Sequence, residues 1–311
     1  SRKGVEGCGR TTSGYYYPQN VDPLVTVNNF AGSVVGPLEY EFGTLWVDRR
    51  RRGVIRFKYE ARSDCGCLDR HGSFTLAPAS SFPGKEKDTD IQQYTGRSYP
   101  KFCIDPLRNR RPWSMEGLSS AQRSDQCNKH IAYDRGHLVP ANHFDHSAKA
   151  IKESNFMINI LPQVDKMNRG AWLQTEMIIE CLREEEVLTI LGGAVYPSGT
   201  LTGNFSMDTT FAQRDDWFLR THGVTNPHYF WKAILADPNG RYKDDFGIIA
   251  FWIPNTAEAI AKNTEKYIVS LAVLEERLQG YNGLPEIFDV PDSVKKHVPS
   301  YWKPLDGCNR G

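Results

Sequence analysis

The sequence predicts a mixed α+β domain, built around a mainly antiparallel central sheet that helices flank. Three observations support this class. Apolar stretches of strand length outnumber helical patterns, residues 54–60 alternate strictly between apolar and polar, and short turns join neighbouring strands. With 311 residues, 40% of them hydrophobic, the chain can bury a sizeable core. No apolar run approaches the ~18–20 residues of a membrane span, so we expect no membrane partner.

In the first half of the chain, the sequence predicts few helices or strands. Residues 1–40 are rich in Gly, Pro and Tyr and read as an N-terminal extension. A hairpin is expected at 43–47 and 54–60, and loops with insertions at 61–130, where turn formers are frequent. A short helix should follow at 148–156. Residues 159–162 should be extended, because the residue before a proline is driven out of the α region.

The second half predicts a helix between strands. Asn168 is expected to cap the N-terminus of that helix. Five residues recur near the helical period and predict its buried stripe: Trp172, Thr175, Ile179, Leu182 and Val187. Further elements are expected as strands at 187–193, 229–235 and 246–253, a turn at 237–240, and a helix at 269–278. We therefore expect one domain at 41–290, followed by a C-terminal extension at 291–311.

The net charge of +1 excludes a globally basic protein, so a nucleic-acid partner must be held by local positive clusters. One cluster is Arg49 to Arg52, for which a solvated face is an equal alternative. The other is Lys101 to Arg111, in a loop-like stretch, where we favour a functional role. Arg110 and Arg111 in this second cluster are candidate substrate-binding residues.

The seven cysteines favour an oxidising compartment. Cys181 lies in a helical pattern and is interpreted as a buried free thiol. The other six lie in loop-like or terminal segments and predict disulfide bonds whose pairing the sequence leaves open: Cys8, Cys65, Cys67, Cys103, Cys127 and Cys308. The spacing Cys65-Gly66-Cys67 is too short for the usual zinc motif. The sequon at Asn204 is compatible with secretion.

The run Asp134-Arg135-Gly136-His137 carries the clearest chemistry of the chain. Hydrolysis of a phosphodiester requires that water lose a proton and that charge on the phosphate be stabilised. His137 can take the proton, because an imidazole is mostly neutral at pH 7. Arg135 stays charged and can bind two phosphate oxygens. Gly136 permits a close backbone approach, and Asp134 can orient a neighbouring group.

A hard divalent cation would complete this chemistry. Magnesium prefers oxygen ligands and keeps several waters, so it needs only one or two protein contacts. Asn168 offers an amide oxygen. Glu176 lies about 12 Å further along a continuous helix at ~1.5 Å per residue, which favours contact through water. A plain helix cap for Asn168 and a solvated helix position for Glu176 are the structural alternatives.

These residues resemble the DNA/RNA non-specific endonuclease family, which includes endonuclease G-like enzymes. The motif residues that carry the resemblance are Asp134 to His137, Asn155, Asn159, Pro162-Gln163, Asn168, Trp172 and Glu176. Later segments also match: Leu191 to Tyr196, Pro227 to Lys232, Pro254-Asn255 and Leu274 to Arg277. The resemblance covers about residues 40–290 and so implies a nuclease domain at 41–290.

The resemblance implies a ββα-metal active site with a histidine base and a single hydrated Mg²⁺, for which Mn²⁺ can substitute. By position, His137 is the base, Asn168 the direct metal ligand, and Glu176 a ligand through water. The implied catalytic residues also include Arg135, Asn159 and Glu176, and the implied substrate-binding residues are Asp134, Asn155, Arg110 and Arg111. One position departs from the pattern. Some members carry an arginine one turn after the glutamate, where this chain has Glu180; Arg183 is a candidate substitute.

Two other functions remain open from the sequence. One is a catalytically inactive relative that binds nucleic acid or a protein partner, although such a relative has no chemical reason to retain His137, Asn168 and Glu176. The other is a phosphodiesterase of small nucleotides on the same chemistry. The resemblance further implies a homodimer and a mitochondrial location, whereas the cysteines favour a secreted protein. We expect little sequence specificity, since phosphate recognition needs no base-reading module.

Overall fold

The computed structural model describes residues 34–48, 53–63, 103–104, 131–196, 226–282 and 287–304. Its centre is a seven-stranded sheet with the order β1-β2-β3-β7-β8-β9-β10, in which every neighbouring pair is antiparallel. The strands are β1 (Val34–Tyr40), β2 (Gly43–Asp48), β3 (Gly53–Ala61), β7 (Leu188–Val195), β8 (Tyr229–Leu235), β9 (Ile248–Pro254) and β10 (Ile268–Val269). The predicted α+β class with a mainly antiparallel sheet is confirmed.

A second, three-stranded antiparallel sheet holds the motif segment. It consists of β4 (Cys103–Ile104), β5 (Ile131–His137) and β6 (Ile160–Val164). Asn255, at the end of β9, ties this sheet to the large one. Its Oδ1 accepts from Val164 N at 2.8 Å, and its Nδ2 donates to the carbonyl of Pro162 at 3.1 Å. The small sheet is therefore fixed at one end of the large sheet.

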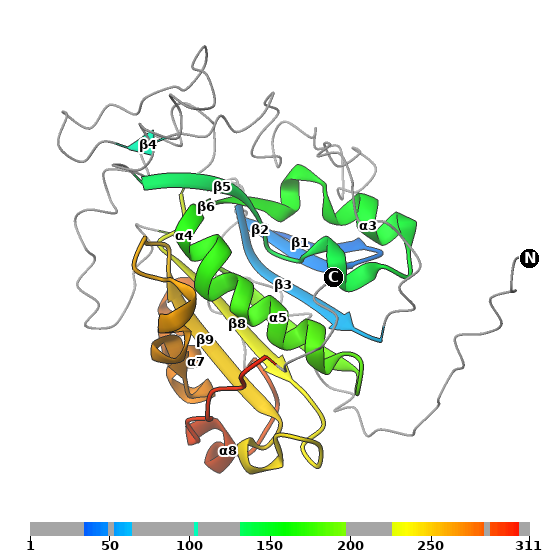
Figure 1. Ribbon diagram of the computed structural model, residues 1–311, viewed down its shortest axis with the longest axis vertical. Helices are drawn as coiled ribbons and strands as arrows, with labels where there is room; N and C mark the ends of the chain where they lie inside the picture. Colours follow the sequence, from blue (N-terminus) through cyan, green and yellow to red (C-terminus); the bar gives the residue numbers. More distant parts are fainter. Residues whose placement is uncertain are drawn as a thin grey trace, which may run out of the picture.

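The helices follow the strands closely in sequence. They are α3 (Ala148–Ser154), α4 (Asp165–Met167), the π-helical turn η4 (Asn168–Trp172), α5 (Leu173–Leu182), α7 (Leu271–Asn282) and α8 (Asp292–Lys296). Short 3-10 turns complete the described chain: η2 (Ala141–Phe144), η3 (Met157–Asn159), η5 (Lys243–Asp245) and η6 (Ala261–Tyr267). In Figure 1, α5 runs across the large sheet beside β3 and β8.

Helices α5 and α7 cover opposite faces of the large sheet, because adjacent residues of a strand point to opposite sides. Lys232 of β8 donates to Thr175 of α5 at 2.8 Å. Its neighbour Trp231 pairs across the sheet with Trp252, whose ring lies 5.3 Å from the Arg277 guanidinium of α7. Both tryptophans are buried, as is Phe251, so these aromatic residues belong to the core.

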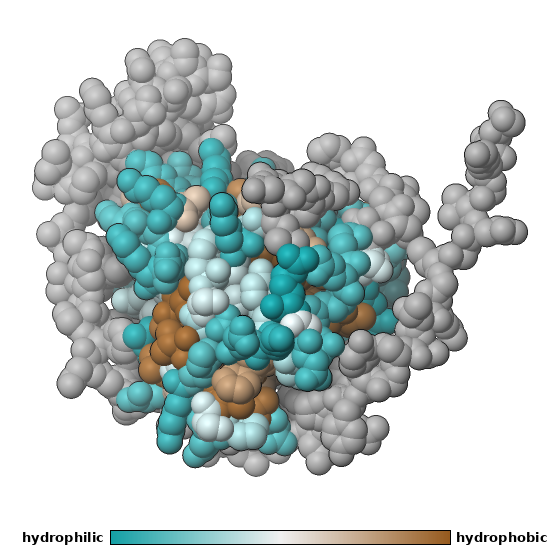
Figure 2. All heavy atoms as spheres, turned by 60° about the horizontal axis from the view of Figure 1, so that its bottom comes forward, coloured by the Kyte–Doolittle hydropathy of each residue, from teal (hydrophilic) through white to brown (hydrophobic). Residues whose placement is uncertain are grey.

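The described surface is mostly polar. On the face seen in Figure 2, hydrophilic side chains cover most of the described area, with small apolar patches between them. In the described part of the chain, no helix has both the length and the apolar character needed to cross a bilayer. The basic clusters at 49–52 and 101–111, including Arg110 and Arg111, lie outside the described residues, apart from the two residues of β4, and so does the sequon.

Three local predictions were wrong. Asn168 is not a helix N-cap, because helical structure already begins at Asp165 and the Asn168 backbone has helical dihedrals. Val187 is 45% exposed and lies beyond the buried stripe, since α5 ends at Leu182. Cys181 is in a disulfide bond and is not a free thiol. The predicted hairpin at 43–60, the helix at 148–156 and the strands near 187–193, 229–235 and 246–253 are confirmed.

Candidate active site

A pocket of about 270 Å³ opens between β5 and the helical segment that follows β6. Its walls are formed by Arg135, His137, Pro140, Ala141, Asn142, Asn168, Arg169, Leu173 and Glu176. Strand β5, the turn η2 and the helical segment η4–α5 contribute these side chains, and β6 is the antiparallel partner of β5. Four residues singled out from the sequence, namely Arg135, His137, Asn168 and Glu176, meet in this one pocket.

Strand geometry places the two motif side chains together. Arg135 and His137 are two residues apart on β5, so both point to the same side of the strand. Gly136 between them points the other way, toward Gln163 of β6. A Cβ at Gly136 would lie 2.1 Å from the Gln163 Cδ, closer than any real contact. Glycine is needed here because a fully buried side chain fills the space that a larger residue would occupy.

His137 is held in one tautomer by Asn155. The Asn155 Nδ2 donates to the Ile151 carbonyl at 2.8 Å, which turns its Oδ1 toward the His137 Nε2 at 3.2 Å. Because an amide oxygen only accepts hydrogen bonds, Nε2 carries the proton of the neutral imidazole. The basic lone pair of the ring therefore lies on Nδ1. The Trp172 Nε1 also donates to the backbone carbonyl of His137, at 3.1 Å.

The surroundings of His137 keep its imidazole neutral. Burial lowers the pKa of this ring from 6.5 to about 4; the hydrogen bond that Nε2–H donates to Asn155 partly offsets this, and the charge of Arg135 adds to it. A neutral imidazole at pH 7 can accept a proton, which is the state a general base needs.

The lowered pKa of His137 makes the stability of the metal-free protein depend on pH. Its imidazole binds a proton below pH ~6.5 in the unfolded chain but only near pH 4 in the folded one. This contribution to stability is therefore complete above pH ~6.5 and is lost as the pH falls toward 4. When the pH is lowered from 7 to 5, we expect the free energy of unfolding in urea to fall by about 1–2 kcal/mol more in wild type than in His137→Gln. Equal losses would mean that His137 is already solvated in the folded state.

Asn168 is oriented by an acidic residue of the motif. Its Nδ2 donates to the Asp134 Oδ2 at 3.1 Å, while the guanidinium of Arg169 binds both Asp134 oxygens at 2.7 and 2.8 Å. With its nitrogen directed to Asp134, Asn168 has its amide oxygen left for a cation. Asp134, predicted as a substrate-binding residue, thus contacts the candidate metal ligand, and the pocket wall contains Asn168 and Arg169 but not Asp134.

A π-helical turn brings Asn168 and Glu176 to the same pocket. Residues 168–172 form this wider turn, and Gly170 within it has non-helical dihedrals (φ −112°, ψ −111°). A Cβ at Gly170 would lie 2.8 Å from the carbonyl oxygen of Ala259, so glycine permits this close packing. The helix is therefore not the continuous α-helix assumed in the spacing estimate. Burial raises the pKa of the Glu176 carboxyl to about 7, against the opposing attraction of Lys232.

Asn159 does not reach the pocket. It is fully buried, and its Oδ1 accepts from Val139 N at 3.1 Å. Its Nδ2 donates to the carbonyls of Val139 and Ser154, both at 2.8 Å. These bonds lock the chain that leaves β5 onto the end of α3, so the geometry gives Asn159 a positioning role and no contact with a substrate. Asn155 likewise lies one step behind the pocket, against His137.

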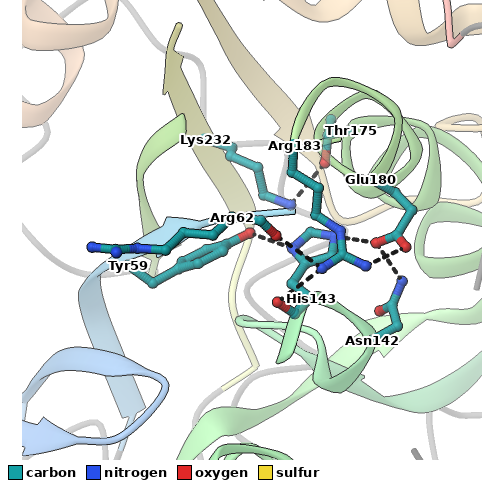
Figure 3. A network of polar contacts seen from close by, with 8 residues as sticks. All are labelled: Tyr59, Arg62, Asn142, His143, Thr175, Glu180, Arg183 and Lys232. Atoms are coloured by element: carbon teal, nitrogen blue, oxygen red, sulfur yellow. Dashed lines mark hydrogen bonds and ion pairs between the residues drawn. The ribbon is translucent and has the colours of Figure 1, made fainter. Parts of the chain in front are cut away.

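Arg183 cannot replace an arginine at position 180, because its guanidinium is buried behind the pocket (Figure 3). It donates to the Glu180 Oε1 at 2.7 Å and to the carbonyls of Arg62 and His143. The other carboxylate oxygen of Glu180 accepts from Asn142 Nδ2 at 3.3 Å. Glu180 and Arg183 thus form a buried ion pair that supports Asn142 on the pocket wall.

Sequence reasoning missed two polar residues of the pocket, Arg169 and Asn142. Arg169 follows the candidate ligand Asn168 directly, and its side chain is 61% exposed. That adjacency was the available signal, since a cation beside an oxygen ligand suits a phosphate site. Asn142 had no comparable signal, because only the folded chain places η2 beside α5.

The donor set fits a weakly ligated hard cation. Within the described ranges, no group of three His, Cys, Asp or Glu side chains is placed to hold a metal ion. A transition-metal site of the zinc type usually needs such a group. Magnesium needs only one or two oxygen ligands and keeps its waters, which matches the Asn168 amide oxygen beside the Glu176 carboxylate.

Two antiparallel strands followed by a helix, beside a mainly antiparallel sheet, define this chain as a ββα-type domain. The family model of the DNA/RNA non-specific endonucleases matches residues 29–289. The chain belongs to this family.

Several mitochondrial nucleases are similar to the chain. Nuclease EXOG of Mus musculus is 28% identical over 182 residues, which cover 58% of this chain and 45% of that protein. Endonuclease G of Bos taurus is 24% identical over 249 residues, covering 70% of this chain and 79% of that protein. The chain spans about half the length of the EXOG relatives. A crystal structure of the EndoG/EndoGI complex aligns with a TM-score of 0.47 at 17% identity, covering 79% of this chain and 83% of that one.

Proposed function

We propose that this chain is a metal-dependent endonuclease that hydrolyses phosphodiester bonds of DNA and RNA with little sequence specificity. One observation carries the proposal: a neutral histidine, an arginine and an amide–carboxylate pair line the same pocket, namely His137, Arg135, Asn168 and Glu176. Membership of the DNA/RNA non-specific endonuclease family supports the same reaction.

His137 acts as the general base in this proposal. Its Nδ1 takes a proton from the attacking water, while Nε2–H stays bonded to the Asn155 oxygen and stabilises the imidazolium that forms. Arg135 stabilises the negative charge that gathers on the phosphate. Arg169 remains tied to Asp134 and adds positive charge at the pocket rim, where a neighbouring phosphate of the substrate can bind.

A magnesium ion, for which manganese can substitute, would be held by the Asn168 amide oxygen and through water by Glu176, and would polarise the phosphate and stabilise the leaving oxygen. Asp134 keeps the Asn168 amide turned in the required direction. Asn159 and Asn155 position the base and its strand. Arg110 and Arg111 lie outside the described residues, and we still propose that they contact phosphate groups of the substrate.

The nuclease domain proposed at 41–290 stays a proposal, with 1–40 and 291–311 as extensions, although Trp302 of the second extension is fully buried in the core. The family match begins at residue 29, and β1 (34–40) adds an edge strand to the sheet of this domain. We propose nucleic acid as the partner, bound through its phosphates, and a homodimer as the assembly. The alternative, an inactive nucleic-acid-binding or protein-binding module, is disfavoured by the retained set of pocket residues.

The proposal is tested by incubating wild type with supercoiled plasmid, a structured RNA and a dinucleotide, each with Mg²⁺ or with EDTA. We expect Mg²⁺-dependent nicking of the plasmid and fragmentation of the RNA, and little cleavage of the dinucleotide. Binding of nucleic acid without cleavage would favour the inactive module. Preferential cleavage of the dinucleotide would favour a small-nucleotide phosphodiesterase.

A further inference from the structure

Lys232 is a fully buried lysine with no carboxylate in hydrogen-bond contact among the described residues. Its ammonium donates to the Thr175 Oγ1 at 2.8 Å and lies 3.7 Å from the centroid of the Trp172 ring. Moving an ammonium from water into a protein interior costs about several kcal/mol, unless contacts inside the protein compensate for the lost hydration. A buried charge at this place, on the strand directly beneath the pocket helix, therefore calls for a reason beyond packing.

The contacts of Lys232 lead to the backbone of the base through one side chain. The Trp172 ring that receives the ammonium is itself fully buried and donates its Nε1–H to the His137 carbonyl oxygen at 3.1 Å. The Thr175 hydroxyl that accepts from Lys232 donates in turn to the Trp172 carbonyl at 2.7 Å. Lys232 thus contacts Trp172 on its ring and, through Thr175, on its backbone.

Among the nearby charged groups, the Glu176 carboxyl attracts the Lys232 ammonium without a hydrogen bond to it. Figure 3 shows Lys232 directed at Thr175, with the Arg183–Glu180 pair beside it. That pair is internally balanced by a 2.7 Å contact between Arg183 and Glu180. Among the described residues, Lys232 is the buried cation that contacts the Trp172 ring and the helix that carries it. A cation over an indole face gains more when both are desolvated, as they are here.

We propose that Lys232 is a positioning residue for the general base: its ammonium fixes the Trp172 indole, and the indole N–H holds the His137 carbonyl at its place on β5. The inference rests on the proposed nuclease function. Lys232 lies on β8, far in sequence from the motif, and its contacts link the large sheet to the small sheet that carries the base.

The variant Lys232→Met tests this role, because it keeps the length of the side chain and removes the ammonium. The ammonium of Lys232 contacts a hydroxyl and an indole ring, so its removal leaves no hydrogen-bonded carboxylate unpaired, and the variant is expected to fold. We expect kcat on supercoiled plasmid to fall about 10- to 100-fold, since a base displaced by ~1 Å loses that much, while KM stays near that of wild type. Lys232→Arg should restore part of kcat.

A second readout uses the protein alone. The ¹⁵N–¹H indole signal of Trp172, assigned with Trp172→Phe, should shift in Lys232→Met and exchange faster with water. Lys295→Met is the matched control: Lys295 is also buried, 3.2 Å from Glu275, and lies outside the pocket. It should change neither readout.

The outcomes separate the two proposals. An unmoved indole signal in Lys232→Met would overturn the positioning role, whether or not kcat falls. If kcat fell while the signal stayed in place, the loss of activity would be due to removal of the positive charge beneath Glu176. A moved signal with kcat within two-fold of wild type would overturn it as well. If wild type itself does not cleave, the nuclease proposal fails, and the indole signal still decides whether Lys232 fixes Trp172.

Discussion

The variant His137→Ala is expected to cleave plasmid and RNA about 10²- to 10⁴-fold more slowly than wild type, the usual contribution of a positioned general base. The reason is specific to one atom. Asn155 keeps the proton on Nε2, so Nδ1 is the proposed proton acceptor, and alanine supplies none. Binding of nucleic acid should be nearly unchanged, because Arg135 and Arg169 retain their charges. The measurement is single-turnover cleavage with Mg²⁺, paired with binding measured in EDTA.

Asn155→Ala serves as the graded control for the base. It removes the acceptor of Nε2–H and leaves the imidazole in place, so a smaller loss than in His137→Ala is expected, with partial recovery in Asn155→Asp. If His137→Ala retained more than about a tenth of the wild-type rate, another group would have to be the base.

The variant Asn168→Ala is expected to weaken the affinity for Mg²⁺ by about 100-fold or more, because it deletes the proposed direct oxygen ligand. Residues that only orient a ligand already contribute about 10–100-fold to metal affinity. Cleavage at low Mg²⁺ should fall in parallel and recover in part at high Mg²⁺. Titration with Mn²⁺, followed by electron paramagnetic resonance, reads the affinity without any substrate.

Asp134→Ala is the matched control for the ligand. It removes the acceptor that turns the Asn168 amide and leaves the ligand itself, so the loss of affinity should be smaller, about 10-fold. An unchanged Mn²⁺ affinity in Asn168→Ala would contradict the assignment of this residue as the ligand.

The sheet could be predicted because its signals are local. Alternation along 54–60 and the apolar runs of β7, β8 and β9 are properties of short segments, and each appears as a strand. The meeting of Arg135 with His137 follows from the period of two on one strand. These features need no knowledge of distant parts of the chain.

Other features depend on residues that are distant in sequence. Asn168 looked like a helix cap, but its side chain is bound by Asp134, 34 residues upstream, and helical structure begins before it. Arg183 looked available to a phosphate, yet Glu180 and two backbone carbonyls bind it in the interior. The contact of Lys232 with Trp172 joins residues 60 positions apart, and nothing in the strand pattern of 229–235 indicates it.

In the proposed reaction, one pocket separates two tasks, proton removal by His137 and cation binding by Asn168. The most direct test measures Mn²⁺ affinity and plasmid cleavage on the same preparations of wild type, His137→Ala and Asn168→Ala. We predict that His137→Ala binds Mn²⁺ as wild type does but does not cleave at a comparable rate, whereas Asn168→Ala loses both binding and cleavage. Cleavage by His137→Ala at the wild-type rate, or full Mn²⁺ affinity in Asn168→Ala, would contradict it.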